Sequence, residues 1–396
     1  MIYKLSNNSN NLRIQSFGEL LEPIEESLQA QTLQKVIDLW KSCFHDTQNY
    51  LEYYFQYKTE DNKIVASFEG EKMTSMVHLN PYEIMVNNEE VPSYYIVGVA
   101  TREDYRKRGL MRKLLQASLQ QMYQEKIPFT YLMPAKESIY LPFDFRTVAI
   151  QERIRLEKKD LHYTKETIDY KCIMIDAKNL MLFKDLSKYS NERLKQSNHV
   201  FTHRSRRYYE VLLAEMKSCN GGIVVIEKNH KICGYAAYVV EEGIIELIDY
   251  LFDDEVEIMK KVLMESILDQ AIIRVKEETE EFTRPTIMTR IVNFKELIPY
   301  VKCNEDMSIR LRVVDPIIDA NNEIYEISWE AGKCTVRQGE DEPELSVDIS
   351  TLTSFIFGSI TTEDLLKFTN KTSSESLEYR LNCIETLSTI HINEVV

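Results

Sequence analysis

The sequence predicts a three-domain protein of mixed α/β and α+β type. Its 396 residues exceed the roughly 100–150 residues of a typical domain, which indicates two or three domains. Strand-like and helix-like segments alternate through the first two thirds, and strand-like segments precede helices in the last third. We place the domains at 1–155, 156–284 and 285–396. The boundary between the second and third domains lies where a charged stretch ends at Pro285.

Composition and charge restrict the class of protein. The residues are 44% hydrophobic and 28% charged, as in globular proteins, and no apolar run approaches the ~20 residues of a membrane-spanning helix. The polar residues 1–11 carry no secretory signal and are expected to form a loose arm. Seven scattered cysteines indicate reduced thiols in a cytoplasmic protein without structural zinc. The net charge of −15 disfavours nucleic acid and favours a cationic small molecule or basic peptide, although it also aids solubility.

The first domain is predicted to begin with helices and to continue as a sheet. Apolar residues recur at helical spacing over 31–45, and 50–57 forms a second short helix. The run 94–101 is almost continuously apolar, which is typical of a strand buried on both faces. Apolar positions after Gly109 repeat every three or four residues and predict a helix. The other expected strands are 64–69, 73–79, 82–86, 129–133 and 147–156, with a helical turn at 138–143.

The middle third repeats this order of elements. Two hairpin strands, a third strand, a charged loop and a helix over 255–275 follow one another, which indicates a second related α/β unit. Its loop at 252–257 is acidic and would repel an anionic coenzyme, so this unit is expected to be degenerate. The last third is expected to be α+β, with strands at 307–314, 324–329, 332–337 and 345–349 and helices at 350–357 and 363–368.

A basic segment at the junction of strand 94–101 and the following helix carries the clearest chemical signal. Five of the eight residues 106–113 are basic, within an acidic chain. The free amides and partial positive charge of a helix N-terminus bind a pyrophosphate, and Gly109 permits close approach. The segment lacks the patterns of a P-loop and of GxGxxG, which disfavours ATP and NAD. A solvated basic helix start is the alternative.

Two motifs resemble those of the GNAT superfamily of N-acetyltransferases. Residues 97–111 resemble its coenzyme A motif, R/Q-x-x-G-x-G/A after an apolar strand, with Met111 in place of the final small residue. Residues 138–145 are similar to A-x-x-[FI]-Y-x-x-[FL]-G-F, with Asp144 in place of the glycine. The resemblance implies direct transfer from acetyl-CoA, with Tyr140 as proton donor to the departing thiolate. A tyrosine that only packs in the core is the alternative for Tyr140.

The same resemblance implies a coenzyme site but no metal. A backbone N–H near Val99 would polarise the thioester oxygen. His199 and His203 are four residues apart on a possible helix, but no third metal ligand is evident. The implied coenzyme-binding residues are Val99, Ala100, Thr101, Lys107, Arg108, Gly109, Leu110, Met111, Arg112, Ala135 and Lys136.

The order of domains resembles that of the enhanced intracellular survival (Eis) family. That family joins an active GNAT domain, a degenerate one and a sterol-carrier-protein-like domain, and the resemblance covers nearly the whole chain. It implies acetylation of primary amines of cationic small molecules such as aminoglycosides, a homohexamer, and the terminal carboxylate, here that of Val396, as base. An ordinary terminal carboxylate, with a pKa near ~3.5, is a weak base and also suits holding a cation. A protein lysine or N-terminal acetyltransferase and a non-catalytic lipid-binding module are the alternatives.

Overall fold

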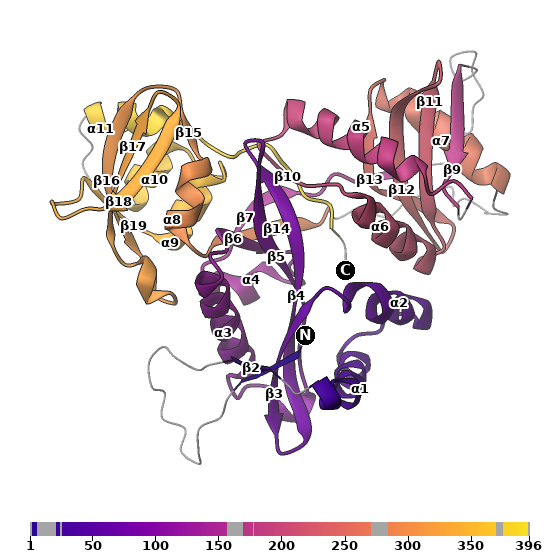
Figure 1. Ribbon diagram of the computed structural model, residues 1–396, viewed down its shortest axis with the longest axis horizontal. Helices are drawn as coiled ribbons and strands as arrows, with labels where there is room; N and C mark the ends of the chain where they lie inside the picture. Colours follow the sequence, from indigo (N-terminus) through magenta and orange to yellow (C-terminus); the bar gives the residue numbers. More distant parts are fainter. Residues whose placement is uncertain are drawn as a thin grey trace.

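The computed structural model describes residues 2–5, 21–23, 26–156, 169–176, 178–270, 284–369 and 375–394. These residues form three lobes in chain order, the first indigo to purple, the second magenta to salmon and the third orange to yellow (Figure 1). Within them, every helix is too short or too polar to cross a membrane. The mixed α/β and α+β fold class is confirmed.

A large sheet forms the first lobe and reaches into the rest of the chain. Its main order is β2-β1-β3-β4-β5-β6-β14-β7, and β10 and β21 extend it beside β4. These strands are β1 (Ile2–Leu5), β2 (Leu21–Pro23), β3 (Lys63–Glu69), β4 (Lys72–Val86), β5 (Glu89–Thr101), β6 (Phe129–Leu132), β7 (Arg146–Ile150), β10 (Val200–Thr202), β14 (Thr286–Ile291) and β21 (Ile390–His391).

Several strand pairings differ from the expectation. The loose arm is wrong for residues 2–5, because β1 pairs in parallel with β3. The single strand over 147–156 is also wrong. Its first part is β7, whereas β8 (Ile154–Leu156) pairs with a strand of the second lobe. Since β14 lies between β6 and β7, the sheets do not divide at residues 155 and 284.

Helices cover both faces of the first sheet. Successive side chains of a strand point to opposite faces, so apolar residues on both faces need a covering layer. Val65 and Val77 face the helix α3, whereas Ala66 and Met76 face α1. The helix predicted after Gly109 is confirmed as α3, and its apolar stripe is buried. The helical elements are α1 (Glu26–Cys43), α2 (Gln48–Tyr53), the π-helix η1 (Tyr54–Lys58), the 3-10 turn η2 (Glu103–Tyr105), α3 (Leu110–Gln124), α4 (Glu137–Tyr140) and the 3-10 turn η3 (Leu141–Phe143).

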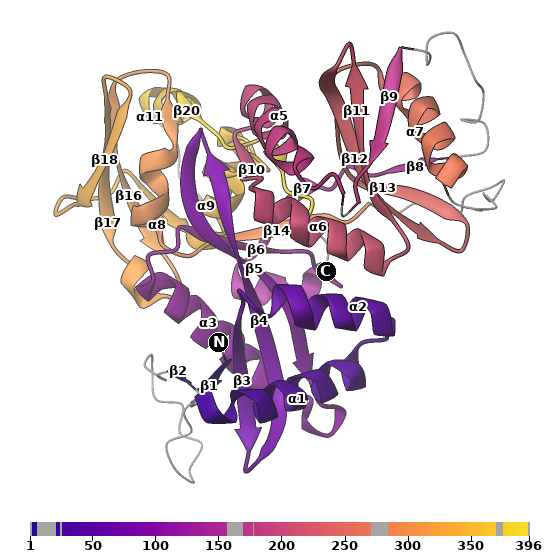
Figure 2. The same cartoon turned by 45° about the vertical axis from the view of Figure 1, so that its right-hand side comes forward.

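The second lobe is a five-stranded sheet of order β8-β13-β12-β11-β9 with helices on both faces. Its helix α6 lies against α2 of the first lobe (Figures 1 and 2). The predicted helix over 255–275 is observed as α7, and its last residues lie outside the described ranges. The further elements are β9 (Tyr170–Met174), α5 (Leu182–Ser197), α6 (Arg206–Ser218), β11 (Gly222–Lys228), β12 (Lys231–Glu241), β13 (Ile244–Phe252) and α7 (Val256–Gln270).

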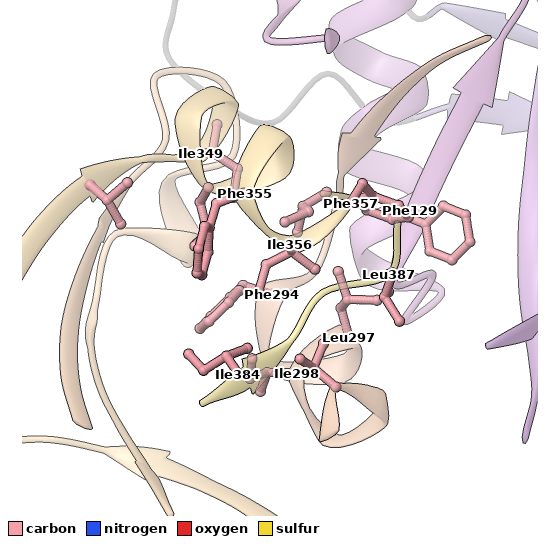
Figure 3. Close-up of a cluster of buried hydrophobic side chains, with 14 of the residues drawn as sticks. Phe129, Phe294, Leu297, Ile298, Ile349, Phe355, Ile356, Phe357, Ile384 and Leu387 are labelled. Atoms are coloured by element: carbon pink, nitrogen blue, oxygen red, sulfur yellow. The ribbon is translucent and has the colours of Figure 1, made fainter. Parts of the chain in front are cut away.

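The third lobe packs a four-stranded sheet of order β18-β17-β16-β19 against short helices. Its core continues into the first sheet, where Phe129 of β6 lies edge-on to Phe357 at a ring-centre distance of 5.3 Å (Figure 3). The elements are α8 (Phe294–Leu297), η6 (Ile298–Tyr300), β15 (Lys302–Cys303), β16 (Met307–Val314), η7 (Asp319–Asn321), β17 (Ile324–Glu330), β18 (Lys333–Gln338), β19 (Leu345–Asp348), α9 (Ile349–Ile356), α10 (Thr362–Phe368), α11 (Glu375–Asn382) and β20 (Ile384–Glu385).

Candidate active site

A β-bulge interrupts the pairing of β4 and β5 just before the basic loop. Ala100 pairs with Met76 and Val97 with His78, so two residues of β5 oppose one of β4. Gly98 occupies this bulge with φ +58°. A Cβ there would lie 2.5 Å from Cζ3 of Trp40, so only glycine fits. Gly98 is not among the residues predicted to bind the coenzyme, because the Trp40 ring that excludes a side chain there comes from a distant helix.

Strands β5 and β6 separate next to this bulge. The two strands pair in parallel at Tyr94 with Thr130 and at Tyr95 with Tyr131. Strand β5 then continues to Thr101 without a further pair to β6 among the described residues. The strand edge that carries Val99, Ala100 and Thr101 is therefore not covered by β6 within the described ranges. Such an edge offers backbone N–H and C=O groups to an extended ligand. The separation suits the amide-containing arm of a coenzyme.

The N-terminus of α3 is open to an anion. Gly109 precedes the helix in a left-handed conformation at φ 76°, and its carbonyl accepts the first helical bond, from Lys113 N–H, at 3.1 Å. The amides of Leu110, Met111 and Arg112 therefore precede the first intrahelical donor. Space beside Gly109 is open, since a Cβ there would meet no described atom within 4 Å. Lys107 and Arg108 are exposed in the same loop, so the structure brings the predicted pyrophosphate-binding residues together.

Tyr140 ends α4 beside this loop. Arg112 lies over the Phe143 ring at 5.1 Å and so links the basic loop to the turn that follows Tyr140. The Tyr140 ring is 8% exposed and packs near Phe145, and burial raises the pKa of its phenol to about 12. Among the described residues this phenol has no hydrogen-bond partner, and burial is the one cause of its raised pKa. A phenol that stays protonated at neutral pH is able to act as a proton donor.

The turn after Tyr140 keeps the geometry of the motif without its glycine. Asp144 adopts φ 65°, the left-handed conformation that favours glycine. The buried guanidinium of Arg290 supports this turn, donating to the Phe143 carbonyl at 2.9 Å and lying 3.7 Å from the Asp144 carboxylate. Ala135 and Lys136, predicted to line the coenzyme, are exposed just before α4. Val396 lies outside the described residues, so its predicted role as base stays a prediction.

A pocket of about 600 Å³ lies between the first and second lobes. Its walls come from η1, β4, β5, α6 and the C-terminal residues Asn393 and Glu394. Charges at its rim are paired, since Arg207 lies 3.3 Å from Asp61 and His203 lies 3.2 Å from Glu83. The pocket is therefore a second site, distinct in its lining from the coenzyme loop.

Two buried carboxylates face this pocket. Glu215 and Glu394 are each 5% exposed, and burial raises the pKa of both. Glu215 accepts a hydrogen bond from the Tyr53 hydroxyl at 2.6 Å. Neither Glu394 carboxylate oxygen has a partner in ordinary hydrogen-bond geometry among the described residues, although the Thr202 hydroxyl and the Arg204 and Lys58 charges lower its pKa. Lys58, whose pKa burial lowers, donates to the Tyr82 hydroxyl at 2.5 Å. The pocket is thus able to accept a cation beside Glu394.

Glu394 also connects the pocket to the place where β5 and β6 separate. After burial, the Glu394 charge is the next cause that raises the pKa of the Tyr131 phenol. Tyr131 pairs with Tyr95 at the last parallel register before the strands diverge. The Glu394 carboxylate therefore lies near the Tyr131 phenol, on the sheet where β5 and β6 diverge.

The two histidines that were weighed as metal ligands and set aside, His199 and His203, do not lie on one helix. They flank the strand β10, His199 bonding to Thr389 and His203 lying beside Glu83 and Glu90. One ligand atom each of His203, Glu83 and Glu90 lies within 4.8 Å of the other two. The sequence did not show that these two carboxylates lie beside His203. All three side chains are at least partly exposed, and their contacts are those of ion pairs at the pocket rim.

Comparisons with known proteins agree with this geometry. Residues 26–148 match the model of the acetyltransferase (GNAT) domain, and residues 292–386 match the sterol carrier protein domain. No curated protein matches the chain in sequence. The domain match assigns residues 26–148 to the GCN5-related N-acetyltransferase type of domain, which uses an acyl-CoA cosubstrate. The C-terminal part of the chain is a sterol-carrier-type domain, as predicted.

Solved structures show that the complete arrangement is shared. A probable N-acyltransferase from Enterococcus faecalis is similar at 16% identity and a TM-score of 0.75, over 92% of this chain and 97% of that one. A GCN5-related N-acetyltransferase from Anabaena variabilis is similar at 16% identity and a TM-score of 0.73, over 92% and 98%. Eis1 from Mycobacterium abscessus is similar at 13% identity and a TM-score of 0.63, over 91% and 96%. The chain therefore has an Eis-like fold.

Proposed function

We propose that the protein transfers an acetyl group from acetyl-CoA directly to a primary amine of a cationic, aminoglycoside-like small molecule. The carboxylate of Glu394 is the observation that carries the choice of acceptor. Burying a carboxylate costs several kcal/mol, the Arg204 and Lys58 charges offset part of that cost, and a substrate ammonium in the pocket would offset more of it. The net charge of −15 favours the approach of such a substrate.

The chemistry requires a neutral amine that attacks the thioester carbonyl. A C–N bond forms, the C–S bond breaks, and one amine proton must leave before attack and a second after it. Tyr140 gives its phenolic proton to the departing thiolate and regains one from the amine nitrogen. Backbone N–H groups at the Gly98 bulge are the donors we assign to the developing oxyanion.

We retain the terminal carboxylate of Val396 as the base that takes the first amine proton. Support comes from the residues before it, because Asn393 and Glu394 line the acceptor pocket. Removing Val396 alone tests this role. The loss of turnover without loss of acetyl-CoA binding is expected, and full activity of the shortened chain would contradict it.

Release of free thiol from acetyl-CoA tests the proposed function. A panel of aminoglycosides, simple amines and neutral alcohols is expected to give release only with the cationic amines. Tyr140→Phe is expected to lower kcat by about 10²-fold, with the KM for acetyl-CoA little changed. Tyr123→Phe, which removes a phenol on α3 that bonds the Ala320 carbonyl, is the matched control. The absence of thiol release with every amine would overturn the proposal.

The other acceptors and roles predict different results. Acetylated lysines in a treated protein mixture, found by mass spectrometry, would favour a protein acetyltransferase. A lipid-binding role is disfavoured, because the apolar pocket in the third lobe measures about 10 Å³, room for little more than a water molecule. Sedimentation would test the homohexamer that the resemblance implies.

A further inference from the structure

A fully buried polar network lies in the second lobe, away from the coenzyme loop. Arg204 and Asp249 are both 0% exposed and form an ion pair, with Nη2 also bonding Oδ1 at 3.0 Å. The Tyr235 hydroxyl donates to the same carboxylate at 2.6 Å. Burying two charges is expensive and is weak evidence for stability alone. The acetyl-transfer scheme gives these residues no role.

The same carboxylate bonds to the C-terminal residues of the chain. Asn393 donates from Nδ2 to Oδ1 of Asp249 at 3.1 Å, and Nε2 of His391 lies 3.3 Å from that oxygen. Burial alone would raise the pKa of Asp249, but Arg204 and His391 lower it well below its ordinary value. Asp249 is therefore an ionised acceptor for two side chains of the tail.

Two further contacts fix the backbone of this tail. Ile390 pairs in parallel with Val200, so β21 adds a strand to the sheet beside β10. Gln151 donates from Nε2 to the carbonyl of Glu394 at 2.9 Å. A two-residue strand is too short to hold a chain end by itself, whereas the Asp249 bonds clamp the residues directly before Glu394.

We propose that Asp249 is a positioning residue that holds the C-terminal tail in the acceptor pocket through Asn393 and His391. The second lobe, which has an acidic loop where the first has its coenzyme loop, thereby forms part of the active site. The proposal rests on the proposed function only in taking the pocket as the amine site. The position of the tail is measurable without any acceptor.

Substitution of Asn393 tests the clamp with little risk to the core. Asn393→Ala is expected to lower kcat for amines by about 10–100-fold, because the tail moves by about 1 Å or more. The KM for acetyl-CoA and the Tm are expected to change little. Asn393→Asp is expected to lower kcat further, since it places a second carboxylate beside that of Asp249. Asn198→Ala, at the C-terminal end of α5, is the matched control.

A second readout follows the tail itself. Carboxypeptidase digestion, followed by mass spectrometry, is expected to stop before residue 393 in the native protein and to pass it in Asn393→Ala. Combining Asn393→Asp with Asp249→Asn is expected to restore both kcat and resistance to digestion, because the hydrogen bond is reversed. A merely structural role would lower Tm and affect both substrates, with no rescue.

Two results would overturn the proposal. The first is native kcat and native resistance to digestion in Asn393→Ala and Asn393→Asp. The second is rapid digestion past residue 393 in the native protein. If Asp249→Asn fails to fold, the Asn393 variants decide alone. If no amine is acetylated, the proposed function fails, while the digestion result still decides whether the clamp exists.

Discussion

Arg290 and Asp315 form a fully buried ion pair, with 2.7 Å between Nη2 and Oδ1, that joins the first sheet to the third lobe. Arg290 also donates to the Phe143 carbonyl in the turn after Tyr140. Asp315 further accepts the amides of Ile317 and Ile318, each at 2.9 Å. The turn after Tyr140 and the third lobe are therefore held by one network.

Removing one partner of this pair should be costly. Asp315→Ala leaves the buried Arg290 guanidinium with only the more distant Asp144 carboxylate, at 3.7 Å, as a charged partner, and a loss of about 3–5 kcal/mol in the free energy of unfolding is expected. Urea titration measures it. The matched control is Glu326→Ala, which breaks an exposed pair with Arg337 and should leave the free energy of unfolding almost unchanged. Equal losses in the two variants would show that this network does not hold the turn after Tyr140 to the third lobe.

The bulge at Gly98 should not tolerate a methyl group. Gly98→Ala combines a left-handed backbone, about 1–2 kcal/mol, with overpacking against Trp40, about 1–3 kcal/mol. Gly70→Ala has the same φ of +58° but open space, so it isolates the backbone cost. Unfolding and acetyl-CoA binding are both measured. A Gly98 variant no less stable than the Gly70 variant would contradict the packing argument.

The basic loop should control coenzyme affinity rather than turnover. Replacing Lys107, Arg108 and Arg112 by alanine is expected to raise the Kd for acetyl-CoA roughly tenfold, at about 0.3–1 kcal/mol per charge. Calorimetry at low and high salt should show that the difference shrinks as salt screens the charges. Lys367→Ala, on the distant helix α10, is the control. An unchanged Kd would leave the loop as a solvated helix start.

Buried tyrosines should make the fold sensitive to alkali. Burial raises the pKa of Tyr140 to about 12, whereas an unfolded tyrosine ionises near ~10. Above pH 10 the unfolded chain therefore loses protons that the folded chain retains, and stability present below pH 10 falls as pH rises. The Tm between pH 8 and 11 measures this fall, which should be shallower in Tyr140→Phe. An identical pH profile would show that this phenol does not contribute.

Local patterns predicted much of the fold. The helix α3 and the strand β5 follow from the apolar pattern within their own residues. A helix buried on one face has apolar residues every three or four positions, and a strand buried on both faces is apolar almost throughout. The basic loop between them was equally visible, as was Tyr140. Elements of weak periodicity, such as α5 and α6, were not predicted.

The contacts between distant segments could not be predicted in the same way. The pairing of β10 with β21, the ring of Trp40 against Gly98 and the two carboxylates beside His203 each join residues far apart in the chain. The possible helix through His199 and His203 is absent for this reason, since the residues between them form β10 and pair with β4.

The sequence by itself determined the class of chemistry, because a helix N-terminus with basic residues and a tyrosine at a fixed distance are local features. Only the tertiary structure decided how the pocket proposed for the acceptor is built. The environment of Glu394 arises where two lobes and the chain end meet, and the Asp249 carboxylate comes from the second lobe. Burial and unpaired charge depend on what surrounds a residue, which its own neighbours in sequence do not specify.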